Sequence, residues 1–350
     1  VYPLVELIML SAYTKPTFCA VCVILWTGTI GLVSAFAHGG GLDGQGGHND
    51  RQAGNYHFHQ GPLVGKTFSN KDEATQALQV AQSDSLNSAD NSDSAADFTS
   101  RLPSPLLPTD QQVITHHGFS LQYDEEHEQA RWVLYKITAE TARGPIDRTD
   151  DFRSDPLVTT GSADLSDYRG SGYDRGHMAP AAAMAWSEIA MSESFYLSNI
   201  SPQNAAFNRG IWRELESKVR SWAVKHGQIW VVTGPILKGD LKKIGDNQVS
   251  VPNYYYKVIL DELEPNISGI GFVMANSNSD EEINEYAVTI DSVESLSDLN
   301  FFPNLEEDIE SEVETKISFS HWDLTEPASI SSERKTWSEI KATTLFQADP

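Results

Sequence analysis

Residues 172–181 read GYDRGHMAPA and bring an acid, a base, a glycine and a histidine into one short segment. Two interpretations are open. In a structural one, Asp174 caps a turn, Gly176 supplies a positive φ and His177 is a satisfied core residue. In a chemical one, Arg175 and His177 point at one substrate atom from a rigid loop. The sequence on either side has to decide between them.

A helix is predicted downstream of this segment. FYLSNISPQNAAFN (residues 195–208) leads into NRGIWRELESKVRSWAVKHG (residues 208–227), which ends at a glycine, a typical helix stop. In the second run, apolar residues recur at spacings of four, four and three, as on one face of a helix: Ile211, Leu215, Val219 and Trp222.

Strand-like runs surround the predicted helix. Residues 119–138, FSLQYDEEHEQARWVLYKIT, are typical of a hairpin with a charged turn. Three further runs are typical of buried strands: QIWVVTGPIL (228–237), NYYYKVIL (253–260) and GIGFVMANS (269–277). Strands on both sides of a central helix predict an α+β domain over residues 113–305.

The polar residues between these elements suit the cleavage of a phosphodiester, which needs a base, a cation and phosphate donors. His177 can be the base, because an unperturbed imidazole is largely neutral at about pH 7. The amide oxygen of Asn208 can be the one protein ligand of a hydrated Mg²⁺. Glu216, about two helical turns further on, lies on the same side and can hold metal-bound waters. Arg175 offers a planar, charged fork to phosphate oxygens.

Three segments together resemble the DNA/RNA non-specific endonuclease family: YRGSGYDRGHMAPAAAM (168–184), FYLSNISPQNAAFNRGIWRELE (195–216) and VVTGPI (231–236). The resemblance covers residues 113–305. It implies a ββα-metal (His-Me finger) fold, in which helices flank a central mixed or antiparallel sheet. It also implies an endonuclease that hydrolyses DNA and RNA with Mg²⁺, or with Mn²⁺ in its place, and a protein that can pair as a homodimer.

The resemblance assigns roles to single residues. His177 is the general base, Asn208 the metal ligand, and Glu216 the residue that orients metal-bound waters. Arg175 and Asn199 support the phosphate and the geometry of the site.

Other arginines are candidates for binding the substrate. A family arginine falls within DRTDDFRSDP (147–156), where Arg148 and Arg153 both qualify. Arg209 stands where the family commonly has glutamine, so it can add a phosphate contact or alter the metal shell. Ala183 replaces a common Asp or Asn and does not touch this chemistry.

The acidic composition of the chain argues against a nucleic-acid partner. Its formal net charge is −24, and from Asp261 onward there are 21 acidic and four basic residues. Such a protein repels polyanions, although residues 161–226 are balanced, with seven charges of each sign. One alternative function is a non-catalytic metal- or polyanion-binding surface protein on a degenerate nuclease scaffold. A phosphodiesterase for small phosphate esters is another.

The N-terminal segment has the parts of a secretory signal. Residues 16–37 are apolar, follow Lys15 and end in Ala35-Phe36-Ala37. Residues 1–37 are thus predicted to be a signal peptide, with an uncleaved anchor as the alternative. Cleavage would give an exported protein, periplasmic or extracellular, without stable membrane association. Both cysteines of the chain, Cys19 and Cys22, lie within this segment.

Residues 38–68 are rich in glycine and histidine and resemble a short YHYH-like element, GGHNDR followed by GxYHxH. Commoner forms of this element carry cysteines where the chain has Gly47 and Phe58. Zinc or copper ligation and a flexible surface patch both stay open for its four histidines: His38, His48, His57 and His59.

Two further segments are predicted outside the folded domain. Residues 69–112 are predicted to be a disordered linker, because they hold too few large apolar residues to fold. Residues 306–350 are predicted to be an acidic C-terminal extension on the periphery.

Overall fold

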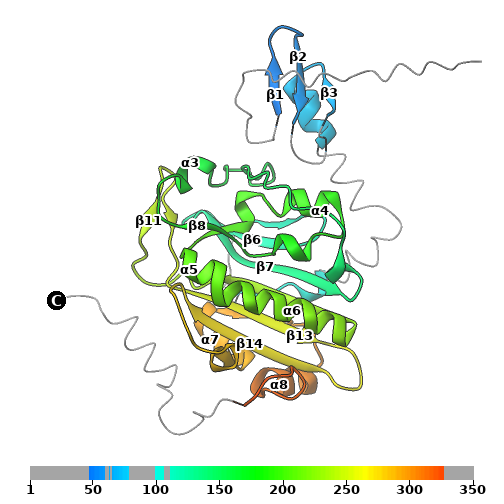
Figure 1. Cartoon of the computed structure of the whole chain (residues 1–350), viewed down its shortest axis with the longest axis vertical. Coiled ribbons are helices and arrows are strands. Elements are labelled where there is room, and N and C mark those ends of the chain that lie inside the picture. The colour runs from blue at the N-terminus through cyan, green and yellow to red at the C-terminus, as the bar shows by residue number, and fades with distance from the viewer. Residues whose placement is uncertain (1–46, 60–62, 64, 79–98, 106–110, 327–350) are drawn as a thin grey trace, which may run out of the picture. The chain divides into compact units, whose positions relative to one another are not determined.

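The computed structural model describes residues 47–59, 63, 65–78, 99–105 and 111–326 (Figure 1). The predicted leader over residues 1–37 and His38 lie outside these ranges. Within them, no helix has the length and apolar character needed to cross a membrane.

One antiparallel sheet forms the centre of the main domain, with the strand order β15-β14-β13-β10-β7-β6-β5 (Figure 1). The predicted hairpin is present as β6 and β7, and the three predicted buried strands are β10, β13 and β14. The bounds are β5 Val113–Thr115, β6 Ser120–Asp124, β7 Gln129–Thr138, β10 Gln228–Pro235, β13 Tyr254–Asp261, β14 Ser268–Ala275 and β15 Ala287–Val288.

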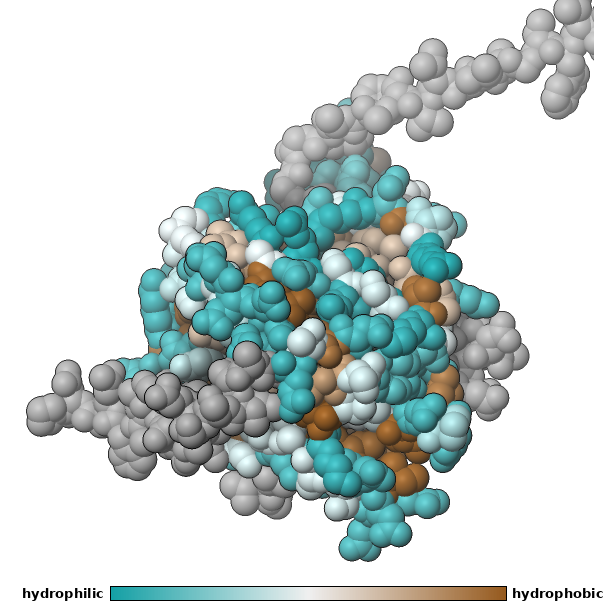
Figure 2. Space-filling view, turned by 60° about the horizontal axis from the view of Figure 1, so that its bottom comes forward, coloured by the Kyte–Doolittle hydropathy of each residue, from teal (hydrophilic) through white to brown (hydrophobic). Residues whose placement is uncertain are grey.

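Both faces of this sheet are buried, because helices cover each of them. Val133 and Tyr135 of β7 belong to the core beneath α6 (Arg213–His226). Their neighbours Trp132 and Leu134 point the other way, as alternation along a strand requires, into a core with α7 (Ile290–Ser297) and α8 (Glu307–Thr315). Figure 2 shows a face that is largely hydrophilic, with apolar residues in small separate groups.

The central helix is confirmed, but its first turns differ from the prediction. Leu215, Val219 and Trp222 of α6 are buried, and Gly227 ends the helix with a φ of 92°. Before it come α5 (Ala205–Phe207) and a π-helical turn (Asn208–Trp212) that is kinked at Gly210, whose φ and ψ are −102° and −117°. A regular helix starting at Asn208 is therefore wrong.

Two short strands precede this helix and form their own antiparallel pair, β8 (Asp174–His177) and β9 (Ile200–Gln203). The chain thus runs from strand to strand to helix through the segment that the motifs occupy. The remaining short elements are η1 Thr141–Arg143, α3 Leu165–Tyr168, η2 Ala181–Ala183, α4 Glu188–Glu193, η3 Leu197–Asn199, β11 Lys243–Ile244, β12 Val249–Ser250 and η5 Ile283–Tyr286.

The segment after residue 305 is not peripheral where the structure describes it. Val313 of α8 is buried in the core on one face of the sheet. Trp322 is buried on the other, where the Trp222 indole nitrogen donates to its carbonyl oxygen at 2.7 Å. The predicted extension is therefore wrong for residues 306–326, which complete the domain, and residues 327–350 lie outside the described ranges.

The N-terminal region contains a small unit of its own. It consists of β1 (Gly47–Asp50), β2 (Asn55–Phe58), β3 (Thr67–Phe68) and a helix at 71–78. Gly47 is required there, because a Cβ at this position would lie 2.5 Å from the Tyr56 hydroxyl oxygen.

The predicted linker over residues 69–112 is wrong in part. Residues 71–78 are helical, and β4 (Ser104–Pro105) pairs with β16 (Leu299–Asn300) in the main domain. Of the remainder, 79–98 and 106–110 lie outside the described residues.

Candidate active site

The β8–β9 pair positions His177 at the end of a strand, opposite Ile200. Gly176 permits this pairing, because a Cβ there would meet the Gln203 side-chain oxygen at 2.1 Å. The His177 ring is 9% exposed and packs between Phe152 and Phe195, whose ring centroids lie 5.5 and 4.9 Å away. Two aromatic rings thus hold the imidazole in one orientation.

The surroundings of His177 keep its imidazole neutral. Burial, together with the positive charges of Arg148 and Arg175, lowers the pKa of His177 to about 3. Its Nε2 atom is buried and has no hydrogen-bond partner among the described residues. At neutral pH the ring is therefore a proton acceptor.

A cleft of about 520 Å³ adjoins the packing around His177, although His177 itself is not among the residues that line it. Phe152 belongs both to its wall and to the packing around the imidazole. Four arginines and two aspartates line it, so the cleft is locally positive in an acidic protein: Arg148, Arg169, Arg175, Arg209, Asp150 and Asp174.

Two of the arginines are stacked on the phenylalanines that hold His177. The guanidinium of Arg175 lies 4.0 Å from the centre of the Phe152 ring, and that of Arg148 lies 4.7 Å from the centre of Phe195. Stacking restricts a long side chain without using its hydrogen-bond donors. Both forks therefore keep donors for a phosphate.

Asp174 ties Asn208 to Arg209. The Asn208 side-chain nitrogen donates to Asp174 at 3.0 Å, and Arg209 donates two hydrogen bonds of 2.7 Å to both carboxylate oxygens. Burial alone would raise the pKa of Asp174, but these hydrogen bonds lower it. The carboxylate is thus ionised and neutralised by Arg209, which is 70% exposed.

The side-chain nitrogen of Asn208 is bonded to Asp174, so its side-chain oxygen is left for another partner. Asn208 also lines the cleft. Asn208 can therefore hold a hard divalent cation. Arg209 lies in the cleft as well, but its guanidinium binds Asp174, so the predicted phosphate contact is at most partial.

Asn199 is fully buried and is not among the residues that line the cleft. Its side chain accepts a hydrogen bond from the Ala179 nitrogen and donates to the carbonyl oxygens of Ala179 and Ser194. All of its polar atoms are thereby used. Asn199 braces the chain that leaves β8, and a direct contact with phosphate does not fit this position.

The two candidate upstream arginines lie in different environments. Arg153 is 3% exposed and donates to Asp151 and to Ser192, both buried. Arg148 is 49% exposed and lines the cleft, where it also pairs with Asp150 at 2.7 Å. A phosphate contact fits Arg148 and not Arg153.

Glu216 is half-buried in the first turn of α6 and is not among the residues that line the cleft. Burial raises the pKa of its carboxyl to about 7, against the opposing positive charges of Lys257, Arg220 and Arg148. The kink at Gly210 interrupts the regular two-turn spacing that predicts Glu216 on the same side as Asn208.

The sequence prediction missed two residues of the cleft. Arg169 and Tyr173 line the cleft, and both lie in the YRGSGY run just before β8. An arginine in a glycine-rich loop beside the motif is a signal that could have found them.

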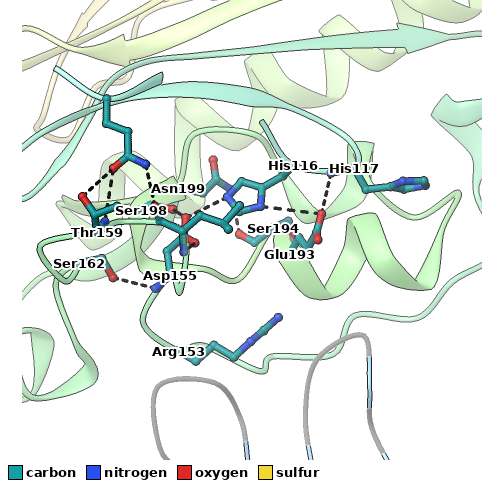
Figure 3. A network of polar contacts seen from close by, with 12 residues as sticks. His116, His117, Arg153, Asp155, Thr159, Ser162, Glu193, Ser194, Ser198 and Asn199 are labelled. Atoms are coloured by element: carbon teal, nitrogen blue, oxygen red, sulfur yellow. Dashed lines mark hydrogen bonds and ion pairs between the residues drawn. The ribbon is translucent and has the colours of Figure 1, made fainter. Parts of the chain in front are cut away.

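A buried polar network lies beside Asn199 (Figure 3). His116 lies 2.9 Å from Asp155, which also accepts a hydrogen bond from Ser198, and the backbone nitrogen of His117 donates to Glu193. Burial alone would lower the pKa of His116, but the charge of Asp155 raises it. These residues lie far apart in the sequence, and no local pattern marks them.

Similarity to known proteins agrees with this geometry. Residues 100–308 match the family described as DNA/RNA non-specific endonuclease. The chain is 39% identical over 221 residues to nuclease EXOG, mitochondrial, of Homo sapiens, which covers 58% of this chain and 59% of that protein. Human endonuclease G, mitochondrial, is 38% identical over 214 residues, with 57% and 72% covered.

Two further matches extend the comparison. Nuclease C1 of Cunninghamella echinulata var. echinulata is 34% identical over 215 residues, with 57% of this chain and 85% of that protein covered. The crystal structure of the EndoG/EndoGI complex, on the mechanism of EndoG inhibition, aligns with a TM-score of 0.54 at 33% identity. That alignment covers 57% of this chain and 89% of the other, and it confirms the predicted ββα-metal fold.

These relatives also correct the predicted location. EXOG and endonuclease G are named as mitochondrial nucleases, so an exported periplasmic or extracellular protein is the wrong prediction. The chain spans 59% of the length of human nuclease EXOG. On the match over residues 100–308, the chain belongs to the DNA/RNA non-specific endonuclease family.

Proposed function

We propose that this chain is a metal-dependent endonuclease that hydrolyses phosphodiester bonds in DNA and RNA. The observation that carries the proposal is a buried His177 packed on Phe152, which also lines an arginine-rich cleft that contains Asn208. Nucleases among the relatives support the same activity.

The residues present fit a hydrated Mg²⁺ ion, for which Mn²⁺ can substitute. Asn208 would hold it through its carbonyl oxygen, because its nitrogen is committed to Asp174. A single protein oxygen is enough for an ion that keeps most of its waters. When bound, the ion supplies positive charge for the phosphate and the departing oxygen. The role of Glu216 in orienting the waters stays a prediction from the family resemblance, since Glu216 is not among the residues that line the cleft.

The chain's own groups carry the proton and hold the phosphate. His177 accepts a proton from water, and the aromatic rings around it fix the direction of that transfer. Arg148 and Arg175 bind the phosphate oxygens and at the same time lower the pKa of His177. A bound phosphate neutralises those two charges, so the imidazole becomes a stronger base when substrate is present.

The supporting residues position this machinery. Arg209 neutralises Asp174 and so removes a charge that would repel phosphate beside Asn208. Arg169 is a further candidate for holding the nucleic-acid backbone. Pairing as a homodimer remains a prediction from the family resemblance.

We propose a mitochondrial location, because the relatives nuclease EXOG and endonuclease G are named as mitochondrial. We propose a protein inhibitor as a partner class, because EndoG is crystallised in complex with EndoGI.

The test is cleavage of plasmid DNA and of RNA by wild-type protein and by His177→Ala, with Mg²⁺ and with EDTA. We expect cleavage of both polymers by wild type, its loss in EDTA, and a fall of about 10²-fold or more in the variant. His117→Ala is the matched control, because His117 is half-buried outside the cleft and stacks on Trp186. Activity of His177→Ala near the wild-type level, or hydrolysis of small phosphate esters alone, contradicts the proposal.

A further inference from the structure

Three histidines gather on one face of the N-terminal hairpin. His57 and His59 are two residues apart on β2 and just beyond it, so they point to the same side, and His48 on β1 pairs directly with His57. Their ring centroids lie 4.5 Å (48–57), 4.8 Å (48–59) and 4.6 Å (57–59) apart. One ring nitrogen from each lies within 4.8 Å of the others.

The opposite face of the same strand is apolar. Tyr56 and Phe58 alternate with the histidines and are buried against Ala74 and Leu78 of the helix at 71–78. The alternation of the strand therefore separates a hydrophobic face from a face of imidazoles. The register of the hairpin brings the three histidines together, and they are not part of its apolar core.

His48 is the buried member of this group. Its side chain is 8% exposed, and both of its ring nitrogens are buried with no hydrogen-bond partner among the described residues. Buried polar atoms are nearly always satisfied, and an exception indicates a missing water, ion or ligand. The position of His48 next to two further imidazoles makes a metal ion the partner that all three can share.

The size of this unit supports the same conclusion. Among its described residues the core has four buried side chains and two partly buried ones, all within residues 47–78, and this segment contains no cysteine. Folded units below about 40 residues generally need a disulfide, a metal or a partner for stability. A metal bound between the two strands would supply that stabilisation.

We propose that His48, His57 and His59 bind one Zn²⁺ ion. Neutral imidazoles prefer Zn²⁺ over Mg²⁺, and three of them leave one position for water. A tetrahedral ion with bonds of about 2.0–2.1 Å brings its nitrogens to roughly 3.3 Å from one another. Small side-chain rotations from the observed spacing reach that distance. The ion would be distinct from the Mg²⁺ of the cleft, which takes an oxygen ligand.

The experiment is a Zn²⁺ titration of the full chain after removal of metals, in excess Mg²⁺ so that oxygen sites are filled. Competition with a chromophoric chelator gives stoichiometry and affinity. We expect one Zn²⁺ per chain, an affinity lower by about tenfold or more in each of His48→Gln, His57→Gln and His59→Gln, and loss of the site in the triple variant. Glutamine keeps the side-chain size and a hydrogen-bonding amide.

Two controls address other Zn²⁺ ligands. His226, Asp261 and His321 form a second cluster with ligand atoms within 4.8 Å, but both of these histidines already contact the same Asp261 oxygen at 3.0 Å. His226→Gln/His321→Gln should therefore keep the binding, as should Cys19→Ser/Cys22→Ser.

The proposal is overturned if the wild type binds no Zn²⁺, if the triple variant binds it as tightly as the wild type, or if either control variant loses it. The visible absorption of bound Co²⁺ gives a second readout. A four-coordinate band in the wild type that disappears in His48→Gln supports the site. Thermal unfolding of each variant shows whether the main domain is intact, independently of nuclease activity.

Discussion

Arg148 and Arg153 stand five residues apart, and their substitution by alanine should have opposite consequences. Arg153 is buried, donates hydrogen bonds to Asp151 and Ser192, and lies 4.0 Å from the centre of the Tyr196 ring. Its removal leaves the Asp151 carboxylate buried without its cation. Breaking a buried pair on one side typically destabilises by about 3–5 kcal/mol.

That loss is large against the total stability of a domain, about 5–15 kcal/mol. At roughly 2–4 °C per kcal/mol for a domain of this size, Arg153→Ala should lower the melting temperature by about 6–20 °C. Cleavage per folded molecule, measured well below the melting temperature, should stay close to the wild-type value, because Arg153 does not reach the cleft.

Arg148→Ala should show the reverse. Its ion pair with Asp150 is exposed and contributes about 0–1 kcal/mol, so the melting temperature should change by no more than about 4 °C. Loss of one positioned donor to a phosphate should lower kcat/KM for plasmid cleavage by about 10²–10³-fold. Calorimetry and initial-rate assays on both variants decide the matter. A stable Arg153→Ala protein, or a fully active Arg148→Ala protein, refutes the assignment.

Three further substitutions test other parts of the structure. Asp174→Ala removes the acceptor that orients Asn208, so the Mg²⁺ concentration for half-maximal cleavage should rise about 10–100-fold, and an unchanged value would contradict the positioning role. The raised pKa of His116 means that its pairing with Asp155 stabilises the fold fully below about pH 6.5 and less as pH rises through the folded pKa. The difference in unfolding free energy between the wild type and His116→Gln, measured in denaturant titrations, should therefore shrink with rising pH. A constant difference would refute the pairing. Trp322→Ala should destabilise by about 3–5 kcal/mol in the same titrations, whereas a peripheral residue would change little.

The sequence predicts the parts of this fold that local patterns encode. The apolar spacing on α6 and the β-rich runs depend on neighbours a few residues away, and both are found where they are expected. The π-helical turn at Asn208–Trp212 is not predictable from local patterns, because its kink depends on the backbone of Gly210 and on packing against the sheet. The same distinction explains Trp322, whose burial against Trp222 is a contact across 100 residues.

The candidate site shows the same limit at the level of side chains. His177 and Asn208 belong to motifs, so their identity suffices to single them out. The sequence contains no information on which of two nearby arginines turns inward, because that depends on whether a buried acceptor such as Asp151 faces the chain. Asn199 is an example of a motif residue that supports the site from the interior without touching it.

The net charge of −24 argues against a nucleic-acid substrate only if charges act over the whole molecule. At physiological ionic strength, exposed charges farther apart than about 8 Å are largely screened. A phosphate in the cleft is therefore governed by the four arginines that line it and by two aspartates, of which Asp174 is neutralised by Arg209 and Asp150 is paired with Arg148. The remaining acidic surface acts mainly at low salt, where it opposes the approach of a polyanion. For this fold the local charge of the cleft, and not the composition of the chain, decides which substrates can bind.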